Sequence, residues 1–444
     1  MRLHQRCIFL GCLLPQALPS ALTQTNPPSL PYSEWMATSI ISRSQGIATG
    51  RGGRSESLQA GFTQKAFRQL LESNSSELSS ETRRTIAEYV SKSVESVVPL
   101  LSNATNDVTS FSLDRLSNGN NLLTLYKTTK NKSYLEALQA LRKSVDLQPR
   151  NQEGGLWYWE VYREWSYLDG MYSFAPFFLD YAYSELADPS SREQAAEEVI
   201  RQLELLWEHC YRDDVGLVVH GYDDSLSAVW VNTDDPKRRG ASPHVWGRSL
   251  GWYMMALVDT LEFLMLNTPT PSPRAYESLL PKFQSLSAAI LEAVDPKTGG
   301  WFQILDEPNR EGNYIESSGS AMFVYSSLKG ARLGLLWDEE RYVDVATRAY
   351  QYIVEKFVIL NDTDGTLGYN GTVGVCSLNS TATFEVSRCG LHSIVSYVEY
   401  NTSFPHSQYY VGQPIEYNSV LGTGAFVVAS VEFERLHSYN GAET

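Results

Sequence analysis

Apolar residues recur every three or four positions along most of this chain, the spacing that places them on one face of an α-helix. Gly- and Pro-rich breakers, such as the stretch at 267–273, separate these segments. Alternating patterns typical of β-strands are short and local. The chain is therefore predicted to be all-α. The clearest apolar faces lie within residues 86–97, 135–145, 196–207, 254–261, 286–293 and 346–353.

A weak internal repeat follows several of the predicted helices, where a glycine step leads into aromatic or β-branched residues. The steps lie about 60–85 residues apart, which is room for two antiparallel helices and their loops. A closed ring of helix hairpins, with the aromatic loops on one side, explains this spacing in a single domain over residues 24–444. Two separate bundles would need a mid-chain linker, and the candidate near Asn267 is short. The steps begin at Gly154, Gly216, Gly299 and Gly365.

Charge and composition narrow the choice of partners. With 36 Lys and Arg against 51 Asp and Glu, the chain has a formal net charge of -15, which disfavours nucleic acid and anionic membrane surfaces. The absence of any run of about 18 apolar residues argues against a membrane-spanning helix. The 10 Trp and 26 Tyr suit a long aromatic cleft of the kind that binds sugars. We expect an oligosaccharide partner and a monomer.

The N-terminal residues 1–23 resemble a secretory signal peptide. Arg2 and Arg6 precede a short apolar core from Cys7 to Leu14, and small residues follow. A disordered, mildly apolar terminus is the alternative. Sequons favour secretion, because only roughly three would arise by chance. We therefore expect an extracellular glycoprotein. The sequons begin at Asn74, Asn103, Asn131, Asn361, Asn370, Asn379 and Asn401.

The cysteines beyond the predicted leader do not have the spacing of a zinc site. Cys376 and Cys389 bracket a short polar loop and could form a disulfide bond. Cys210 lies on a predicted helix, where we expect it to be buried. No metal or organic cofactor is expected.

The densest aromatic stretch, residues 154–183, places Asp169 between the rings of Tyr167 and Tyr172. Burial among rings disfavours the ionised form of a carboxyl group, so Asp169 is a candidate proton donor. An Asp-Gly turn or a helix cap is the alternative. Asp114 precedes another predicted helix and is by default an N-cap. As a second carboxyl group it could bind a sugar hydroxyl and help its partner to stay protonated.

Two later segments add candidate binding groups. His220 ends a β-like segment, where a single histidine is more often structural than catalytic. Arg248 lies between Trp246 and Trp252 at the predicted start of a helix, and its guanidinium group matches a carboxylate. A surface salt bridge is the alternative. Polar groups that could bind sugar hydroxyls, or simply pack within loops, follow at Gln303, Asn313 and Glu316.

Taken together, these segments resemble glycoside hydrolase family 105, the unsaturated rhamnogalacturonyl hydrolases. Order and spacing agree over about residues 35–435, so the match is specific although each motif is weak alone. The motifs are Asp114 with Asn118-Gly119, Gly154-Gly-Leu-Trp157, Leu168-Asp-Gly-Met-Tyr172, His220, Trp246-Gly-Arg248 with Gly251-Trp252, Gly300-Trp301, Asn313-Tyr314 with Glu316, and Gly422-Thr-Gly-Ala-Phe426.

The resemblance implies an (α/α)6 barrel and an exo-acting enzyme that removes a 4,5-unsaturated uronic acid from the non-reducing end of oligosaccharides. The galacturonyl ends of rhamnogalacturonan or pectin lyase products are the expected substrate. In such families an aspartic acid protonates C4, water adds at C5, and the hemiketal opens and expels the neighbouring sugar. Asp169 is then the acid and base, Asp114 a hydroxyl-binding partner, and Arg248 with His220 the uronate site. The implied walls of the pocket are Trp157, Tyr167, Trp246 and Trp252.

Other functions stay open at this point. An unsaturated glucuronyl hydrolase of the family 88 type would differ more in substrate than in mechanism. Another sugar enzyme on the same barrel, such as an epimerase or an endo-mannanase, is an alternative. An endo-mannanase would need adjacent aspartates at the catalytic turn, whereas Gly170 follows Asp169. A non-catalytic protein could use the cleft for affinity alone. The chain departs from the family 105 pattern at Tyr158, Trp159 and Tyr167.

Overall fold

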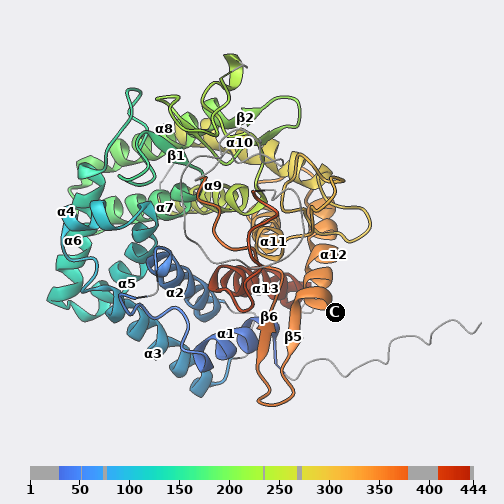
Figure 1. The fold of residues 1–444 in the computed structure, drawn as a ribbon. Helices are drawn as coiled ribbons and strands as arrows, with labels where there is room; N and C mark the ends of the chain where they lie inside the picture. Colours follow the sequence, from blue (N-terminus) through green and yellow to red (C-terminus); the bar gives the residue numbers. More distant parts are fainter. Residues whose placement is uncertain are drawn as a thin grey trace, which may run out of the picture.

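The computed structural model describes residues 30–51, 53–73, 78–233, 236–267, 273–378 and 409–440. In this part of the chain, six helices surround the centre of a ring (Figure 1). Each inner helix packs against the next, and the last one returns to the first. The structure thus confirms the (α/α)6 barrel. The inner helices are α2 (Glu56–Glu72), α5 (Gly119–Thr129) with the 3-10 turn η1 (Leu113–Asn118), α7 (Asp169–Tyr183), α9 (Gly247–Asn267), α11 (Ser317–Arg332) and α13 (Val420–Asn440).

A second ring of helices covers the first, so that each inner helix has an outer partner. The first and last helices close the ring, because the Ser33 N–H donates a hydrogen bond of 3.0 Å to Glu434 Oε1 on α13. Short helical segments lie in the connections: α4 (Ala104–Ser110), η2 (Pro189–Ser191) and η3 (Pro236–Arg238). The outer helices are α1 (Tyr32–Ser42), α3 (Ser80–Val97), α6 (Lys132–Leu147), α8 (Arg192–Cys210), α10 (Pro273–Glu292) and α12 (Glu339–Phe357).

Sequence patterning decides which ring a helix joins. On α12 the buried residues Tyr342, Ala346 and Ile353 follow a single stripe, so this helix covers the core with one face. On α13 every residue from 425 to 429 is buried, because apolar side chains point in all directions. Helix α9 is long and apolar enough to cross a membrane by length and composition, but 78% of that stretch is buried inside the protein, as in a core helix.

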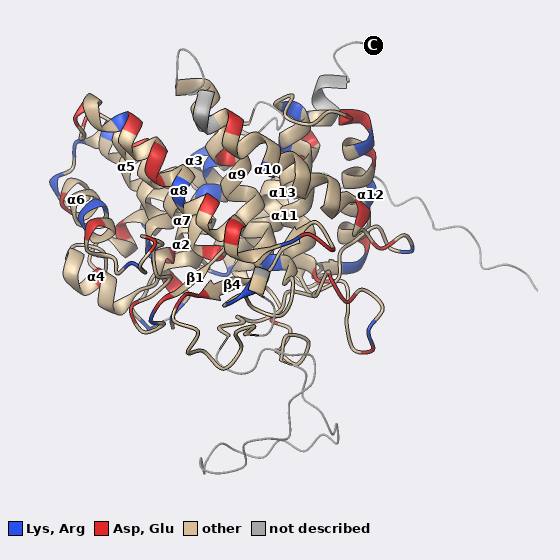
Figure 2. Cartoon of the chain, turned by 90° about the horizontal axis from the view of Figure 1, so that it is seen from above, with Lys and Arg blue, Asp and Glu red and all other residues tan. Residues whose placement is uncertain are grey.

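The loops that follow outer helices carry the predicted glycine steps. All four glycines have positive φ, at 87° for Gly154, 70° for Gly216, 78° for Gly299 and 71° for Gly365, where a larger residue would be strained. Small antiparallel sheets form beside them, and Figure 2 shows β1 and β4 among long loops at one end of the barrel. The pairs are β1 (Trp165–Tyr167) with β4 (Gly221–Asp223), β2 (Tyr211–Arg212) with β3 (Leu217–Val218), and β5 (Val358–Leu360) with β6 (Leu367–Tyr369).

Several sequence predictions lie outside the described residues: the leader at 1–23, Cys389, and the sequons at Asn74, Asn379 and Asn401. The sequon asparagines at 103, 131 and 370 are exposed. Cys210 is buried on α8, as predicted. Cys376 is a buried free thiol, and its predicted disulfide partner is not among the described residues.

Candidate active site

One cavity of about 260 Å³ opens at the N-terminal ends of the inner helices. It receives Leu58 from α2, Asp114 from η1, Asp169 from α7 and Leu421 from α13. The structure therefore gathers at one place residues that lie more than 350 positions apart in the sequence. The predicted site residues that line it are Asp114, Tyr167, Asp169, His220, Trp246, Arg248 and Trp252.

Trp157 is a predicted wall residue that lies outside this lining. Its carbonyl oxygen accepts a hydrogen bond of 2.8 Å from Gln148 Nε2, and its N–H donates to Pro149 O at 3.0 Å. The next residue, Tyr158, takes the place in the cavity wall that the motif suggested for the tryptophan.

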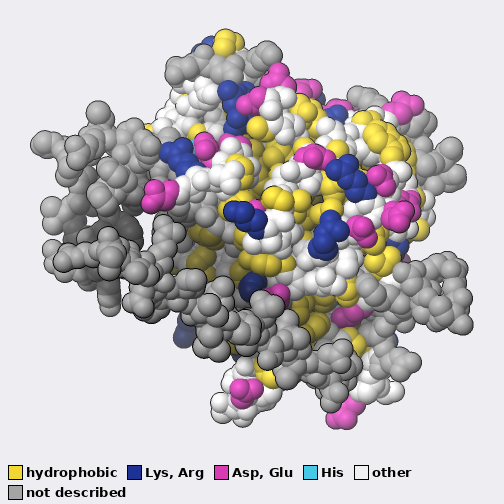
Figure 3. Space-filling model, turned by 90° about the vertical axis from the view of Figure 1, so that its right-hand side faces the viewer, with side chains coloured by type: hydrophobic (Ala, Val, Ile, Leu, Met, Phe, Trp, Pro, Cys, Tyr) yellow, Lys and Arg dark blue, Asp and Glu magenta, His cyan; other side chains and the backbone are white. Residues whose placement is uncertain are grey.

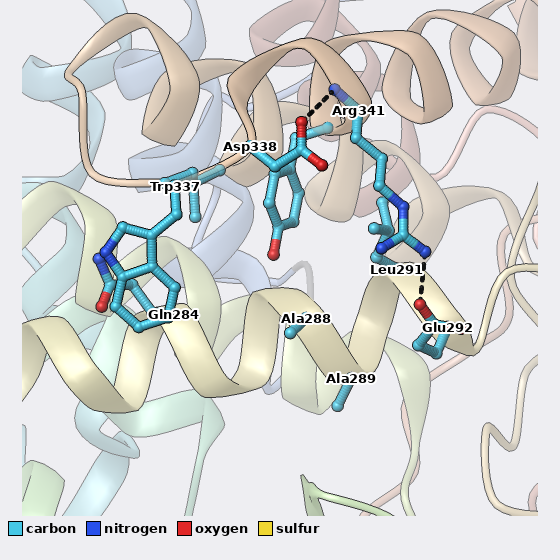
Figure 4. A pocket seen from close by; sticks show the side chains of 10 residues that line it. Gln284, Ala288, Ala289, Leu291, Glu292, Trp337, Asp338 and Arg341 are labelled. Carbon is cyan, nitrogen blue, oxygen red and sulfur yellow. Dashed lines mark hydrogen bonds and ion pairs between the residues drawn. The ribbon is translucent and has the colours of Figure 1, made fainter.

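Two other hollows of similar volume hold none of the predicted site residues. A hollow of about 280 Å³ lies on the outer surface between α10 and α12 (Figure 4), where Trp337 is 87% exposed and Arg341 pairs with Glu292. The side of the molecule with α12 has interspersed acidic and basic side chains (Figure 3). A third cavity, of about 290 Å³, is lined by Lys65, Asp259 and Lys329. The three cavities have similar volumes, so the candidate active site is identified by the chemistry of the residues that line it.

Asp169 is the first residue of α7, and the sheet beneath the cavity fixes its place. Tyr167 pairs with Gly221 across β1 and β4, and the Leu168 N–H donates to His220 O at 3.1 Å. The Ser249 hydroxyl donates a hydrogen bond to Asp169 Oδ2, and His220 Nε2 lies 3.5 Å from the same oxygen. Because both contacts reach Oδ2, Oδ1 is the oxygen with capacity for a bound sugar.

Asp114 lies in η1 and is not the N-cap that its position suggested. Ser112 is the cap, because its hydroxyl accepts from the Asp114 N–H at 3.4 Å. The Tyr158 hydroxyl donates to Asp114 Oδ2 at 2.5 Å, whereas Oδ1 is buried without a partner among the described residues. Burial, with a smaller contribution from the nearby charge of Asp169, raises the pKa of Asp114 to about 6. An orphaned carboxyl oxygen at a cavity wall is suited to accept a hydrogen bond from a sugar hydroxyl.

Rings hold His220 rigidly beside Asp169. The imidazole is 1% exposed, and its centroid lies 4.9 Å from that of Tyr167 and 4.8 Å from that of Trp246. Its other ring nitrogen, Nδ1, lies 3.3 Å from the hydroxyl of Tyr410. Such packing lets a histidine set the orientation of the carboxyl group next to it.

Arg248 is buried, but its guanidinium group already has hydrogen-bond acceptors. Nη1 donates to Val373 O at 2.5 Å and Nη2 donates to Gly374 O at 2.6 Å, while Trp246 lies against the guanidinium at 4.8 Å. These bonds fix the segment 373–377, part of which lines the cavity. All of these partners are neutral, and within the described part of the chain no carboxylate pairs with Arg248. The buried Glu316 reaches Arg248 only through the Ser318 hydroxyl, so the positive charge lies beside the cavity without a directly bonded carboxylate.

The polar groups considered for sugar hydroxyls mostly hold loops instead. Gln303 Oε1 accepts from Trp246 Nε1 at 3.1 Å, and its Nε2 donates to Tyr410 O. Glu316 caps α11 by accepting from the Gly319 N–H at 2.7 Å, and it also accepts from the Val373 N–H at 3.1 Å. Asn313 binds main-chain groups of its own loop. The alternative of ordinary loop packing describes these three residues better.

Sequence reasoning missed five residues that complete the site. Ser249 contacts Asp169, Tyr158 contacts Asp114, and Arg54, Trp159 and Tyr162 line the open side of the cavity. Tyr158 and Trp159 had one signal, since both depart from the pattern of the family the chain resembles. Ser249 and Arg54 had none, because they lie far from the aspartates in the sequence.

The family of the chain follows from its matches. The family model described as Glycosyl Hydrolase Family 88 matches residues 76–437. The chain belongs to this family. As a member of the family it is a glycoside hydrolase, which removes the non-catalytic alternative.

Known proteins support the same assignment. A family 105 glycoside hydrolase of C. acetobutylicum is 28% identical with a TM-score of 0.69, covering 91% of this chain and 99% of that one. Protein Atu3128 of Agrobacterium fabrum is 32% identical over 259 residues, which is 58% of this chain and 96% of that protein. An unsaturated glucuronyl hydrolase of Bacillus sp. GL1 shares the fold, at 12% identity and a TM-score of 0.59 over 91% of this chain and 95% of that one. The expected resemblance to the family 105 and family 88 type is thus confirmed.

Proposed function

We propose that this family 88 member removes a 4,5-unsaturated uronic acid from the non-reducing end of oligosaccharides made by polysaccharide lyases, with galacturonyl ends of rhamnogalacturonan or pectin as substrate. The observation that carries the proposal is the pairing, in one cavity, of an acid with an oxygen available to a ligand and a buried cation without a directly bonded carboxylate. Asp169 supplies the first and Arg248 the second.

The proposed reaction is the hydration of a vinyl ether. Asp169 transfers its proton to C4, the double bond electrons form the new C–H bond, and the oxygen of water bonds to C5. The water proton returns to the Asp169 carboxylate. The C5 hemiketal then opens to a ketone, and the hemiacetal left at C1 expels the neighbouring sugar. Asp114, with its unpartnered Oδ1, receives a hydroxyl of the sugar.

Electrostatics support a singly charged sugar as the ligand. A buried charge without a partner is costly, so a uronate carboxylate near Arg248 would relieve that cost. The first turns of α7, α9 and α13 also point their main-chain N–H groups toward the cavity end, where helix dipoles favour negative charge. The net charge of -15 opposes the binding of a long polyanion, but a short oligosaccharide end experiences mainly the local field.

The proposal is tested with lyase-generated unsaturated disaccharides, whose double bond absorbs in the ultraviolet. The wild-type enzyme should remove this absorbance, and Asp169→Asn should lose at least about 1,000-fold in kcat, as expected for a lost general acid. Heavy water should leave deuterium at C4. Asp180→Asn is a matched control, because Asp180 lies on the same helix, pairs with Lys127 at 3.6 Å, and is outside the cavity.

Three results would argue against this mechanism. Undiminished activity of Asp169→Asn would remove the assignment of the acid, and a product without deuterium at C4 would exclude hydration. A rate that still rises above neutral pH would also contradict it, since the carboxyl group must be protonated to start the reaction.

A second candidate is an unsaturated glucuronyl hydrolase, because the matching family model is that of family 88. Lyases remove the C4 stereocentre by which galacturonate and glucuronate differ. The unsaturated ring is then the same in both cases, and the linkage and the next sugar separate the two activities. Parallel assays on pectin-derived and glycosaminoglycan-derived disaccharides decide between them.

We also propose that the enzyme is secreted. The signal-like residues 1–23 and the exposed sequon asparagines at 103, 131 and 370 support this. Expression in a eukaryotic host should deliver active enzyme to the medium, with a mass that falls on treatment with an endoglycosidase. Retention of an unglycosylated protein inside the cells would contradict it.

A further inference from the structure

The open and closed sides of the cavity differ in how exposed their lining residues are, so the two sides are suited to different sugars of the substrate. His220, Trp246, Arg248 and Trp252 are each at most 2% exposed, so they form the closed side, with the acid among them. Arg54 is exposed and Tyr162 is half-buried, which places them toward solvent. If the unsaturated ring binds next to Asp169, the neighbouring sugar lies toward Arg54 and Tyr162.

Contacts with Trp159 and Tyr162 hold the side chain of Arg54 at this position. Its guanidinium carbon lies 5.1 Å from the centroid of Trp159, and Nη1 lies 3.5 Å from the Tyr162 hydroxyl. Trp159 is itself fixed, because its Nε1 donates to Thr109 O at 3.3 Å and its ring packs edge-on against Tyr162. An arginine stacked on an indole keeps its hydrogen-bonding edge available, and less side-chain freedom is lost when it binds.

Arg54 also lacks a counter-ion. In the part of the chain that the structure describes, no carboxylate pairs with it, and the charged residues that share the cavity with it are Asp114, Asp169 and Arg248. The two aspartates belong to the buried side, with Tyr158 and Ser249 on their oxygens. A positive charge thus faces the place of the second sugar in a protein whose net charge is -15.

We propose that Arg54 binds an anionic group on the sugar next to the unsaturated uronate, so that the enzyme prefers lyase products whose second sugar carries a carboxylate or a sulfate over products with a neutral second sugar. This rests on the proposed uronyl hydrolase function and narrows its substrate class, because it favours pectin fragments whose second sugar is galacturonate over rhamnogalacturonan fragments whose second sugar is rhamnose. Because the unsaturated ring loses the stereocentre at C4, discrimination between polysaccharides has to come from the linkage and from this second position.

The test compares kcat/KM on three unsaturated disaccharides, in which the second sugar is rhamnose, galacturonate or a sulfated hexosamine. The wild-type enzyme should prefer the two anionic substrates. Arg54→Ala should raise KM for these about fivefold, in the range for a charge pair near solvent, and leave rhamnose within about twofold. Arg54→Lys should restore part of the preference, and added salt should weaken it in the wild type. The better of the two anionic substrates identifies carboxylate or sulfate as the group bound.

Arg51→Ala is the matched control, because Arg51 is an exposed arginine in the same loop that does not line the cavity. It should leave all three substrates unchanged. Equal losses on all substrates in Arg54→Ala, or no loss on any, would overturn the role of Arg54 while leaving the hydrolase function intact. If the wild type consumes none of the disaccharides, the proposed function itself is wrong and this inference falls with it.

Discussion

Two buried aspartates at opposite ends of the barrel have pKa values that move in opposite directions. Asp114 is 4% exposed at the active-site cavity, and Asp259 is 9% exposed at the cavity behind it. The pKa of Asp114 is raised to about 6, mainly by burial. Burial acts in the same direction on Asp259, but Lys329 and Lys65 outweigh it and hold the pKa of that carboxyl group well below its usual range.

The geometry at the far end explains this reversal. Lys329 Nζ lies 2.6 Å from Asp259 Oδ1, Lys65 Nζ pairs with Oδ2, and the Tyr325 hydroxyl donates to Oδ1 at 2.7 Å. Both oxygens therefore face cations. A pair of tilted rings, Tyr172 and Trp252 with centroids 4.4 Å apart, separates this cluster from the active site, since Tyr172 lines one cavity and Trp252 the other.

The comparison shows that burial alone does not decide whether a carboxyl group keeps its proton. At the far end, two lysines stabilise the ionised form of Asp259, so the three residues form an ion cluster that stays charged. At the active site, the charge of buried Arg115 opposes the rise in the pKa of Asp114 only slightly, because its Nη1 donates to main-chain carbonyls, and Asp114 accepts a hydrogen bond from a phenol and not from a cation. A carboxyl pair without a cation partner is suited to hold and transfer a proton.

The largest expected effect comes from breaking the far-end cluster. Lys329→Met should lower the free energy of unfolding by about 3–5 kcal/mol, because it leaves the buried carboxylate of Asp259 and the half-buried one of Glu262 with fewer partners. Urea unfolding at neutral pH measures this. The kcat of the folded fraction should stay unchanged, because the Tyr172 and Trp252 rings separate the cluster from the acid.

A surface ion pair gives the control. Lys356 lies beside Glu355 at 2.9 Å with its side chain 51% exposed, and Lys356→Met should leave the free energy of unfolding nearly unchanged. A similar cost for both variants would show that the far-end cluster contributes no more than an exposed pair.

The second prediction uses pH to compare the two aspartates. A raised pKa in the folded state stabilises the protein below the ordinary value of 3.8, and this contribution is lost as the pH rises through 6. The wild type should therefore lose roughly 2 kcal/mol of stability relative to Asp114→Asn between pH 4 and pH 7. A lowered pKa acts in reverse, so the contribution of Asp259 should be constant above about pH 4 and be lost only in stronger acid.

Measurement of unfolding free energies for the wild type, Asp114→Asn and Asp259→Asn across this range checks both signs. If the two differences from wild type follow the same pH course, the electrostatic contrast between the two ends does not exist.

Much of the fold was predictable because it depends on local periodicity. The apolar face at 346–353 forms α12, and the glycine steps mark positions with positive φ, which nearly every other residue avoids. The buried face of one helix differs slightly from the predicted one. In the stretch at 135–145, Tyr134 and Ala137 are buried while Leu135 is half-buried, because the inner ring covers a slightly rotated face of α6.

The site was predictable only in part, for a physical reason. Asp169, His220 and Arg248 lie in motifs, and the barrel brings them together at the ends of its inner helices. What each side chain touches depends on partners far away in sequence, such as the carbonyls of 373 and 374 that bind Arg248. No local pattern specifies such contacts, so the sequence did not reveal that the guanidinium group of Arg248 also holds the segment 373–377 in place.

The smallest expected effect tests the hydrogen bond from Tyr158 that limits the rise in the pKa of Asp114. The Tyr158 hydroxyl stabilises the ionised form of this carboxyl group, so Tyr158→Phe should raise the pKa of Asp114 further, by about one unit for a bond of this kind. The acidic limb of kcat/KM should then move about one unit toward neutral pH, which lowers kcat/KM about twofold at pH 7 and more at acidic pH. Tyr134→Phe is the matched control, because its hydroxyl donates to the carboxylate of Glu95 and it lies outside the cavity. A uniform loss at every pH would mean that Tyr158 only shapes the wall of the cavity, and that Asp114 does not limit the rate through its charge.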